Sequence, residues 1–320
     1  VWASLGLLFV WESVASLLGE QTVKVGRESV TLPTSRSWRV SSPVLAFALI
    51  PLFANWQWAS RAGHRDTRDF AADLLNSVEP YGVLVTVGDN DTFPLWYAQE
   101  VEGIRKDVVV ANTSLLNTDW YVRQLIRRPI YEYDAAKGPA IYRNQQWAKP
   151  TTAPLHMTML DADSVPAYLP LNGPMSFTSG SLKATIDPRN LDHGVLQRAD
   201  LFVLRMIQDS WPQRPIYFAR TSGSYARSLG MGDAVLTQGL AAKLFMPPTA
   251  ATKDTLYLQG DGWLDVDRSN ALWRSVFVGP QSVIKSGDWI DRPSVGIPYL
   301  YVATGANLAQ ILSERGDAAD

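Results

Sequence analysis

The sequence has 320 residues, a formal net charge of −2, no cysteine, three histidines and twelve tryptophans. The near-neutral charge excludes the broad basic field of a nucleic-acid-binding domain, so no nucleic-acid partner is expected. The lack of cysteine excludes disulfides, thiol nucleophiles and thiolate metal sites, and the histidines lack the spacing of a zinc-binding helix. Tryptophan is typical of membrane interfaces and of sugar-binding surfaces, and also of ordinary cores.

Two apolar runs open the chain. Residues 1–18 are apolar except for Glu12 and three serines, and residues 43–58 form a second run that ends with Trp56 and Trp58. The second run is shorter than the roughly 20 residues that span a bilayer, but its tryptophan pair suits a membrane interface. We therefore predict that residues 1–58 are the C-terminal end of a transmembrane module. A buried core helix is the alternative for residues 43–58.

The flanks of these runs bear on their origin and orientation. The chain begins with Val1 inside an apolar run and without signal-peptide features, so we expect the membrane module to continue upstream. Basic residues in the loop between the runs favour a cytoplasmic loop and an extracytoplasmic location for the chain after residue 58. These are Lys24, Arg27, Arg36 and Arg39, and they are opposed by Arg61, Arg65 and Arg68 beyond the second run.

From residue 59 the pattern becomes that of an α/β domain. A continuous β-branched run at residues 83–87 is typical of a buried parallel strand, and Gly88 to Asp91 break it. Thr92 is expected to cap the following helix. The predicted elements are a helix at 66–76, a strand at 83–87, a helix at 95–101, a strand at 108–111 and a helix at 115–126. This order predicts a parallel or mixed sheet flanked by helices.

The rest of the chain is more irregular. Further predicted elements are a strand at 184–186, a helix at 195–209, a strand at 216–219, a helix at 235–245 and an amphipathic helix at 299–315. We divide the soluble part into an α/β domain at residues 59–250 and a helical tail at residues 251–320. A helix followed by Gly-Asp is common in helical repeats, so the tail could open a repeat array.

The Asp89-Asn90-Asp91 loop is the strongest chemical candidate. It lies at the carboxyl end of a predicted parallel strand, the edge at which open α/β sheets bind ligands. Two carboxylates two residues apart can share Mg²⁺ or Mn²⁺. Alternatively, Asp and Asn side chains bond their own backbone in tight turns and cap the next helix. The spacing favours the turn and cap, so no metal is assigned, with Asp89 and Asp91 kept as the alternative metal pair.

Polar residues followed by an aromatic pair occur after both predicted strands, which suggests a shared cleft. A tryptophan beside a carboxylate suits a sugar, whereas core packing is the alternative. Arg214 before a later strand could hold a phosphate or carboxylate, or form an ion pair. The candidate binding cleft comprises Asp89, Asn90, Asp91, Thr92, Trp96, Tyr97, Glu100, Asn112, Asn117, Asp119, Trp120, Arg214 and Tyr217. No catalytic residue is assigned.

Two segments resemble a known family. They are VTVGDNDTFPLWYAQEVEGIRKDVVVANTSLLNTDWY at residues 85–121 and WPQRPIYFA at residues 211–219. Both resemble the C-terminal part of bacterial membrane proteins of the domain of unknown function 2723 family, which are similar to transmembrane protein 260-type protein O-mannosyltransferases. The resemblance covers residues 55–245. It implies a polytopic glycosyltransferase of the bacterial inner membrane, with a lipid-linked sugar donor and a periplasmic soluble domain.

The resemblance also implies that the catalytic acidic residue lies in a membrane module upstream of residue 1, and that no nucleotide-sugar metal is needed. We therefore expect an accessory domain without a cofactor of its own, and with no sugar-transfer activity when isolated. Its expected partners are membrane lipid and an acceptor protein or glycan, or the head group of the donor. A non-catalytic scaffolding module and a metal-dependent enzyme using Asp89 and Asp91 are the alternatives.

Overall fold

The computed structural model describes residues 2–60, 62–248, 250–259, 261–286 and 294–316. The chain forms two compact units, Val1–His64 and Arg65–Asp320, each described here on its own.

The first unit is a set of apolar helices with one hairpin. Its elements are α1 (Trp2–Leu18), β1 (Glu20–Val25), β2 (Glu28–Pro33), α2 (Ser35–Ser41), the 3-10 helix η1 (Ser42–Ala48) and α3 (Leu49–Ala59). Strands β1 and β2 pair antiparallel, and this hairpin was not predicted. Trp11 packs edge-on against Trp38, with ring centroids 4.6 Å apart, and donates to Ser41 Oγ at 3.0 Å. These contacts fasten α1 to α2.

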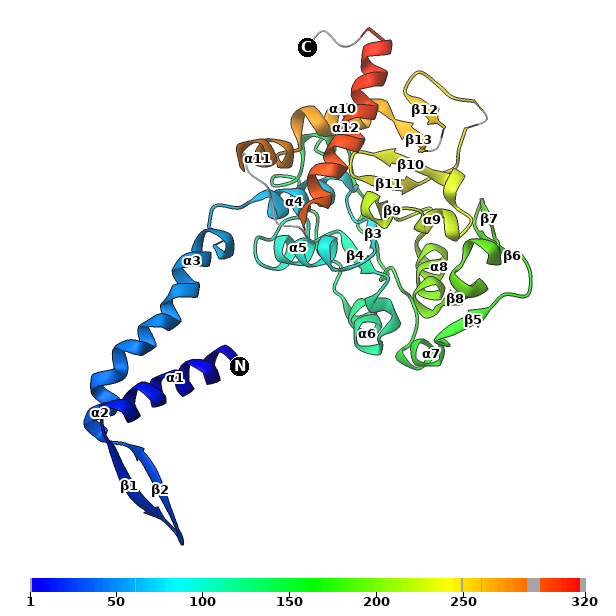
Figure 1. Cartoon of the computed structure of the whole chain (residues 1–320). Coiled ribbons are helices and arrows are strands. Elements are labelled where there is room, and N and C mark those ends of the chain that lie inside the picture. Colours follow the sequence, from blue (N-terminus) through cyan, green and yellow to red (C-terminus); the bar gives the residue numbers. More distant parts are fainter. Residues whose placement is uncertain (1, 61, 249, 260, 287–293, 317–320) are drawn as a thin grey trace. The chain divides into compact units, whose positions relative to one another are not determined.

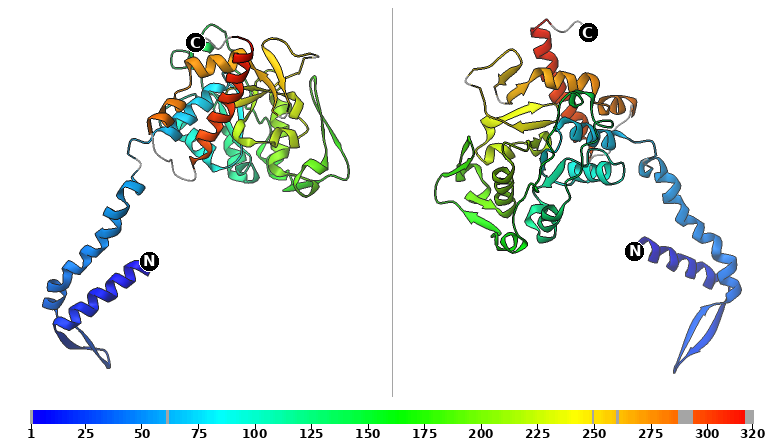
Figure 2. Two further views of the ribbon diagram at one scale, coloured as in Figure 1. Left: turned by 45° about the horizontal axis from the view of Figure 1, so that its top comes forward. Right: turned by 180° about the vertical axis from the view of Figure 1, so that it is seen from behind.

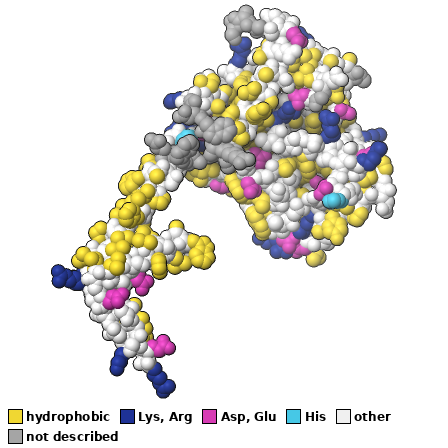
Figure 3. All heavy atoms as spheres, viewed as in Figure 1, with side chains coloured by type: hydrophobic (Ala, Val, Ile, Leu, Met, Phe, Trp, Pro, Cys, Tyr) yellow, Lys and Arg dark blue, Asp and Glu magenta, His cyan; other side chains and the backbone are white. Residues whose placement is uncertain are grey.

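One helical stretch of this unit has the character of a membrane span. Ser35–Trp56 is long and apolar enough to cross a bilayer by length and composition, and α1 is a shorter apolar helix. The stretch begins earlier than the predicted run at 43–58, because α2 and η1 continue into α3. Figure 3 shows hydrophobic side chains covering these helices, while charged side chains of both signs lie on the hairpin.

The second unit is built on a seven-stranded mixed sheet. Its strands are, in spatial order, β12 (Thr255–Leu258), β13 (Gly262–Asp265), β10 (Val235–Gln238), β11 (Ala241–Leu244), β9 (Ile216–Ala219), β3 (Val83–Thr86) and β4 (Val109–Asn112). β3 pairs parallel with β4 on one side and with β9 on the other. The predicted parallel pairing of the first two strands is therefore confirmed, as is the α/β class.

Helices cover both faces of this sheet (Figures 1 and 2). Val83 and Val85 pack on one face with α6, α8 and the hairpin of β6 (Met175–Ser179) and β7 (Leu182–Ile186), whereas Leu84 packs on the other with α4, α5, α10 and α12. The alternation follows from the two-residue period of a strand. The helices are α4 (Asp66–Ser77), α5 (Asp89–Glu100), α6 (Asp119–Arg127), α8 (Arg198–Ser210), α10 (Val266–Ser275) and α12 (Gly296–Glu314).

Smaller elements fill the long connection from β4 to β9 and the loops after β9. They are α7 (Met159–Ser164), β5 (Tyr168–Pro170), β6 (Met175–Ser179), β7 (Leu182–Ile186), β8 (Val195–Gln197), α9 (Tyr225–Ser228) and α11 (Gly279–Ser286), with the 3-10 turns η2 (Leu115–Asn117) and η6 (Arg220–Ser222). β5 pairs with β8, and β6 pairs with β7. The predicted strand at 184–186 is confirmed as the end of β7.

The predicted helix at 235–245 is wrong. This segment is the antiparallel hairpin of β10 and β11, in which Gln238 pairs with Ala241. Gly239 forms the turn with a φ of 63°, and a Cβ atom there would meet the Phe277 ring at 2.7 Å. A glycine inside a short apolar run therefore marks a hairpin turn here rather than a tolerated helix position.

Other boundaries also differ from the predictions. The predicted helix at 115–126 is broken at Thr118 into η2 and α6, and the predicted helix at 195–209 begins as strand β8 before α8 starts at Arg198. Strands β12 and β13 were not predicted in the C-terminal tail. Helices at 66–76 and 299–315 are confirmed as α4 and α12, and the strand at 216–219 is confirmed as β9.

Helix α4 is fastened to the C-terminal helices through one buried carboxylate. Asp73 accepts hydrogen bonds from the backbone N–H groups of Val278 and Gly279, at 3.0 and 2.8 Å, and from the Tyr301 hydroxyl at 2.7 Å. Its side chain is fully buried. Burial raises the pKa of Asp73 to about 6, although the three hydrogen bonds oppose this rise.

A buried ion pair stabilises the loop before β4. Arg105 and Asp107 form a two-armed ion pair, with nitrogen–oxygen distances of 3.0 and 2.9 Å. Arg105 also donates to the carbonyls of Leu75 and Val78 at the end of α4, and Asp107 accepts from the backbone N–H of Tyr81. This pair ties the end of α4 to the entry of β4.

Candidate functional site

The carboxyl ends of β3, β4 and β9 meet at one edge of the sheet, because the three strands run parallel. Buried polar residues at this edge include Thr86, Asp91, Thr92 and Asn112. Thr86 and Asn112 are the last residues of β3 and β4, and the other two lie in the first turns of α5. Buried polar groups persist only when they are hydrogen-bonded, so their partners define the edge.

Asn112 is the centre of these contacts. Its side-chain amide donates to the Gly88 carbonyl and to Thr92 Oγ1, both at 2.7 Å, and its side-chain oxygen accepts from the backbone N–H of Leu115 at 2.9 Å. Thr92 Oγ1 also lies 2.8 Å from Thr86 Oγ1. Gly88 presents its carbonyl with a φ of 101°, a conformation that glycine adopts readily. The network fixes where α5 begins relative to both strands.

Asp91 connects this network to the strand on the other side. Its carboxylate accepts from the Thr221 hydroxyl at 2.6 Å, in η6 directly after β9, and from Thr92 Oγ1 at 3.2 Å. Burial raises the pKa of Asp91, while the hydroxyls of Thr221 and Thr92 and the backbone N–H groups of Asp91 and Thr92 oppose the rise. One carboxylate thus joins the ends of three parallel strands.

An apolar cavity of about 660 Å³ opens beside Asp91. α5 contributes Phe93 and Pro94 to its wall, and α12 contributes Tyr299 and Leu300. The polar part of the wall consists of Thr67, Asp89, Asn90, Asp91, Thr221 and Ser294. Carboxylates and hydroxyls set against aromatic rings can bind a ligand that has both hydroxyl groups and an apolar face.

A smaller and more polar cavity of about 300 Å³ adjoins the first one, since Val87 lines both. Its wall includes Ser114, Asn117, Asn190, Asp192 and Gln197. Asp200 and Tyr225 also contribute to the wall, and the Tyr225 hydroxyl donates to Asp200 at 2.7 Å. The edge of the sheet therefore has an apolar cavity and a polar cavity next to each other.

The predicted Asp89-Asn90-Asp91 loop is not a loop. α5 begins at Asp89, so all three residues belong to its first turn, and Gly88 rather than Thr92 precedes the helix. Residues two apart on a helix point in different directions, so Asp89 is exposed whereas Asp91 is buried. Both residues line the large cavity, but they leave the helix in different directions. Among the described residues no group of three metal-ligating side chains occurs.

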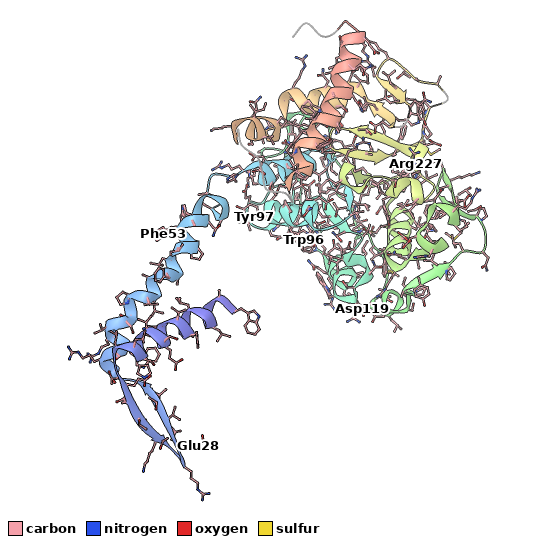
Figure 4. The ribbon with its side chains drawn as sticks, viewed as in Figure 1. Glu28, Phe53, Trp96, Tyr97, Asp119 and Arg227 are labelled. Atoms are coloured by element: carbon pink, nitrogen blue, oxygen red, sulfur yellow. The ribbon has the colours of Figure 1, made fainter. Side chains whose placement is uncertain are left out.

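The aromatic residues that follow on α5 have different environments. Trp96 is half-buried and packs against Tyr121 and Phe93, with ring centroids 6.0 and 5.7 Å away, whereas Tyr97 is exposed. Glu100 lies at the far end of α5 and pairs with Lys106 at 2.9 Å. Figure 4 shows Trp96 and Tyr97 side by side on α5. Packing accounts for Trp96, and Tyr97 is accessible to a partner.

Of the candidates after β4, only Asn117 is among the residues that line the polar cavity. Asn117 lines it and accepts from the backbone N–H of Ala199 at 3.1 Å. Asp119, at the start of α6 (Figure 4), pairs with Arg198 at 2.5 Å, and this arginine holds the pKa of Asp119 below its usual range. Trp120 is exposed.

Arg214 and Tyr217 are not at this edge. Arg214 precedes β9 and therefore lies at the amino edge of the parallel strands, where it is buried and donates to the Thr152 carbonyl at 3.0 Å. Burial lowers its pKa to about 10. Tyr217 is buried in the middle of the sheet and donates to Gln238 Oε1 at 2.8 Å.

Sequence reasoning missed Thr86, Thr221 and the contribution of α12. The strand at 216–219 was predicted, so the rule that polar residues follow parallel strands would have identified Thr221. Thr86 has no distinguishing signal in the sequence, since threonine is common in strands. No local signal brings α12 to the cavity, because it lies about 200 residues further along the chain than α5.

Residues 67–185 match the family described as TMEM260-associated domain 2. The matched segment runs from α4 into β7 and contains β3, α5, β4 and most of the network around Asn112. The match is consistent with a TMEM260-related family. No curated protein and no solved structure matches the chain.

Proposed function

We propose that this chain is the extracytoplasmic accessory part of a membrane glycosyltransferase that uses a lipid-linked sugar donor. In this proposal the two adjoining cavities bind carbohydrate, either on the acceptor or in the head group of the donor. The observation that carries the proposal is the paired apolar and polar cavities around Asp91 and Val87. They lie at the edge at which open α/β sheets bind ligands, and part of their walls comes from the segment that matches a TMEM260-associated domain.

The candidate span Ser35–Trp56 supports a membrane protein, and the resemblance of residues 55–245 supports a bacterial inner-membrane protein with this domain in the periplasm. The chemistry of the cavities fits an amphiphilic ligand. Asp89 and Asp91 can accept hydrogen bonds from sugar hydroxyls, and Phe93 and Tyr299 offer ring faces for the apolar side of a sugar ring or for a lipid chain.

A scaffolding function is the second candidate, and the exposed apolar residues of α12 favour it. Tyr299 and Val302 project from this helix and could contact another protein. A metal-dependent enzyme centred on Asp89 and Asp91 gains no support from the helical geometry described above.

The proposal is tested by ligand binding to the purified full chain in detergent micelles. Saturation-transfer NMR with a short-chain polyprenyl-phosphate sugar should show contacts from the sugar protons, and Asp89→Asn should weaken them several-fold. Glu100→Gln is the matched control, because it removes an exposed carboxylate from the other end of α5. Equal binding by wild type and Asp89→Asn, or no binding to wild type, would reject the carbohydrate site.

A further inference from the structure

A third cavity, of about 410 Å³, lies at the carboxyl end of β9 and within the second unit. The turn after β9 and helix α9 form one side of it, and the starts of the neighbouring strands contribute to the rest. Its polar wall residues are Arg220, Ser222, Ser224, Arg227 and Asp261. We call it the arginine cavity.

The charged side chains on the wall of the arginine cavity are two arginines and one aspartate. Arg220 pairs with Asp261 at 2.5 Å, and its buried Nε atom still lacks a hydrogen-bond acceptor. Arg227 is exposed, and no described residue pairs with its guanidinium or accepts a hydrogen bond from it. Asp233 is exposed and does not belong to the wall. The wall therefore carries one positive charge in excess, on an arginine whose donors are free.

Arg227 is supported along its stem rather than at its charged end (Figure 4). A Cβ atom at Gly232 would lie 3.1 Å from the Cγ atom of Arg227 and 3.2 Å from its Cβ atom, so the two residues are closely packed. Ser224 lies three residues before Arg227 and lines the same cavity. A guanidinium and a hydroxyl with free donors are suited to an anion. A tetrahedral phosphate presents oxygens to donors from different directions, whereas a carboxylate presents two oxygens in one plane.

The segment 220–228 separates the arginine cavity from the two cavities described above. Thr221 lines the apolar cavity, while its neighbours on both sides line the arginine cavity. Within α9, Tyr225 lines the small polar cavity, whereas Arg227 lines the arginine cavity. Gly223 is exposed, and a Cβ atom there would meet nothing within 4 Å, so the top of the turn leaves room for a ligand. One ligand with a sugar, a phosphate and an apolar chain can therefore reach all three cavities.

We propose that the arginine cavity binds the phosphate group of a phosphate ester, with Arg227 as its main contact and Ser224 as a second donor. The organic part of the ester then occupies the adjoining cavities. This inference rests on the proposed function, and it selects the head group of the donor rather than an acceptor glycan, because an unmodified glycan has no phosphate to place beside Arg227.

The test is a set of phosphorus-31 NMR titrations on the full chain in micelles of a phosphate-free detergent, because this signal reports on the phosphate itself. The probes are a short-chain polyprenyl phosphate without sugar, the same polyprenyl phosphate with a sugar, and inorganic phosphate. Arg227→Gln removes the charge and keeps a polar side chain. Arg127→Gln on α6 is the matched control, because Arg127 is also exposed, is also unpaired among the described residues, and lines none of the three cavities.

We expect Arg227→Gln to weaken binding of the sugar-free polyprenyl phosphate by about five- to tenfold, through loss of a charge-assisted contact, and Arg127→Gln to leave it unchanged. Equal binding by wild type and Arg227→Gln, an equal loss in Arg127→Gln, or no binding to wild type would overturn the proposal. Inorganic phosphate that binds as tightly as the ester would also overturn it, since the adjoining cavities would then contribute nothing.

The same titrations separate this proposal from the carbohydrate site. Asp89→Asn should weaken binding of the probe that carries a sugar and leave the sugar-free probe unaffected. If Asp89→Asn changed neither probe while Arg227→Gln weakened both, the phosphate site would stand and the carbohydrate site would be rejected. The reverse pattern would reject the phosphate site alone.

Discussion

Replacing Asp73 by alanine should detach the C-terminal helices from α4. The substitution leaves three buried donors without an acceptor: the backbone N–H groups of Val278 and Gly279 and the hydroxyl of Tyr301. An unsatisfied buried polar group costs about 1–3 kcal/mol. Partial relaxation and water entry reduce the total, so we expect a loss of about 3–6 kcal/mol in the free energy of unfolding, a large part of the stability of a domain.

The same carboxylate should also give the stability a characteristic pH dependence. Its folded pKa of about 6 lies above the ordinary value of 3.8. A raised folded pKa means that the contribution is fully present below about pH 4 and is lost as the pH rises through 6. The rise corresponds to about 3 kcal/mol. Asp73→Asn keeps an acceptor oxygen but cannot ionise, so it should remove this dependence.

Urea unfolding of the full chain in a mild detergent, followed by circular dichroism between pH 4 and 7, measures both effects. The stability advantage of wild type over Asp73→Asn should be larger at pH 4 than at pH 7 by about 2 kcal/mol, because the unfolded carboxyl is already partly ionised at pH 4. Taking this difference removes the titration of all other carboxylates. A difference that is constant with pH, or a cost below 1 kcal/mol for Asp73→Ala, would refute the reasoning.

The remaining predictions concern the sheet, its edge and the membrane part. Val85→Asp places an unpaired charge in a buried strand and should abolish folding, whereas Val85→Ile should fold; expression followed by circular dichroism decides between them. Asp91→Ala should lower the free energy of unfolding by about 1–3 kcal/mol, because Thr221 and Thr92 lose their shared acceptor, whereas Asp91→Asn should lower it less. Thermal unfolding measures both variants. If millimolar Mg²⁺ stabilised wild type but not Asp91→Asn, the metal site would be supported instead. Asp107→Ala leaves Arg105 buried without its counter-ion and should cost about 3–5 kcal/mol in urea unfolding, and a cost near zero would contradict the buried-pair account. Purified residues 1–320 should need detergent to stay monomeric and should not transfer sugar from a polyprenyl-phosphate donor; monodisperse behaviour in plain buffer or measurable transfer would contradict these two expectations.

The central part of the fold was predictable because its signals are local. Continuous apolar residues at 83–87 and 108–111 mark strands that are covered on both faces, and the helix between them makes a parallel pair. The hairpin at Gly239 was not predicted, since a run such as Val235–Gln238 is equally compatible with a buried helix or strand when the turn glycine is not weighted. Strands β12 and β13 extend the sheet beyond β10, through pairings that the local sequence does not specify.

At the candidate site, the polar residues at the strand ends were predictable from the sequence, but the residues that form the walls of the cavity were not. Thr92 and Asn112 meet because parallel strands end together, as the order of elements implies. The direction of each carboxylate depends on where α5 begins, and that start is set by Gly88 and Asn112 rather than by a local capping side chain. α12 reaches the cavity through tertiary packing, which no periodicity in its own sequence reveals.

The link between α4 and the C-terminal helices has a consequence for biosynthesis. The hydrogen-bond donors to Asp73 are 205 to 228 residues further along the chain. During translation, therefore, the first helix of the second unit emerges with a carboxylate that is bonded only to water and with an uncovered apolar side, and it remains so until Tyr301 has been made. Contacts of such long sequence separation form slowly and leave apolar surface open in the meantime. A ribosome stalled before residue 278 would present a nascent chain with its sheet half covered, a substrate for chaperones and proteases on whichever side of the membrane it emerges.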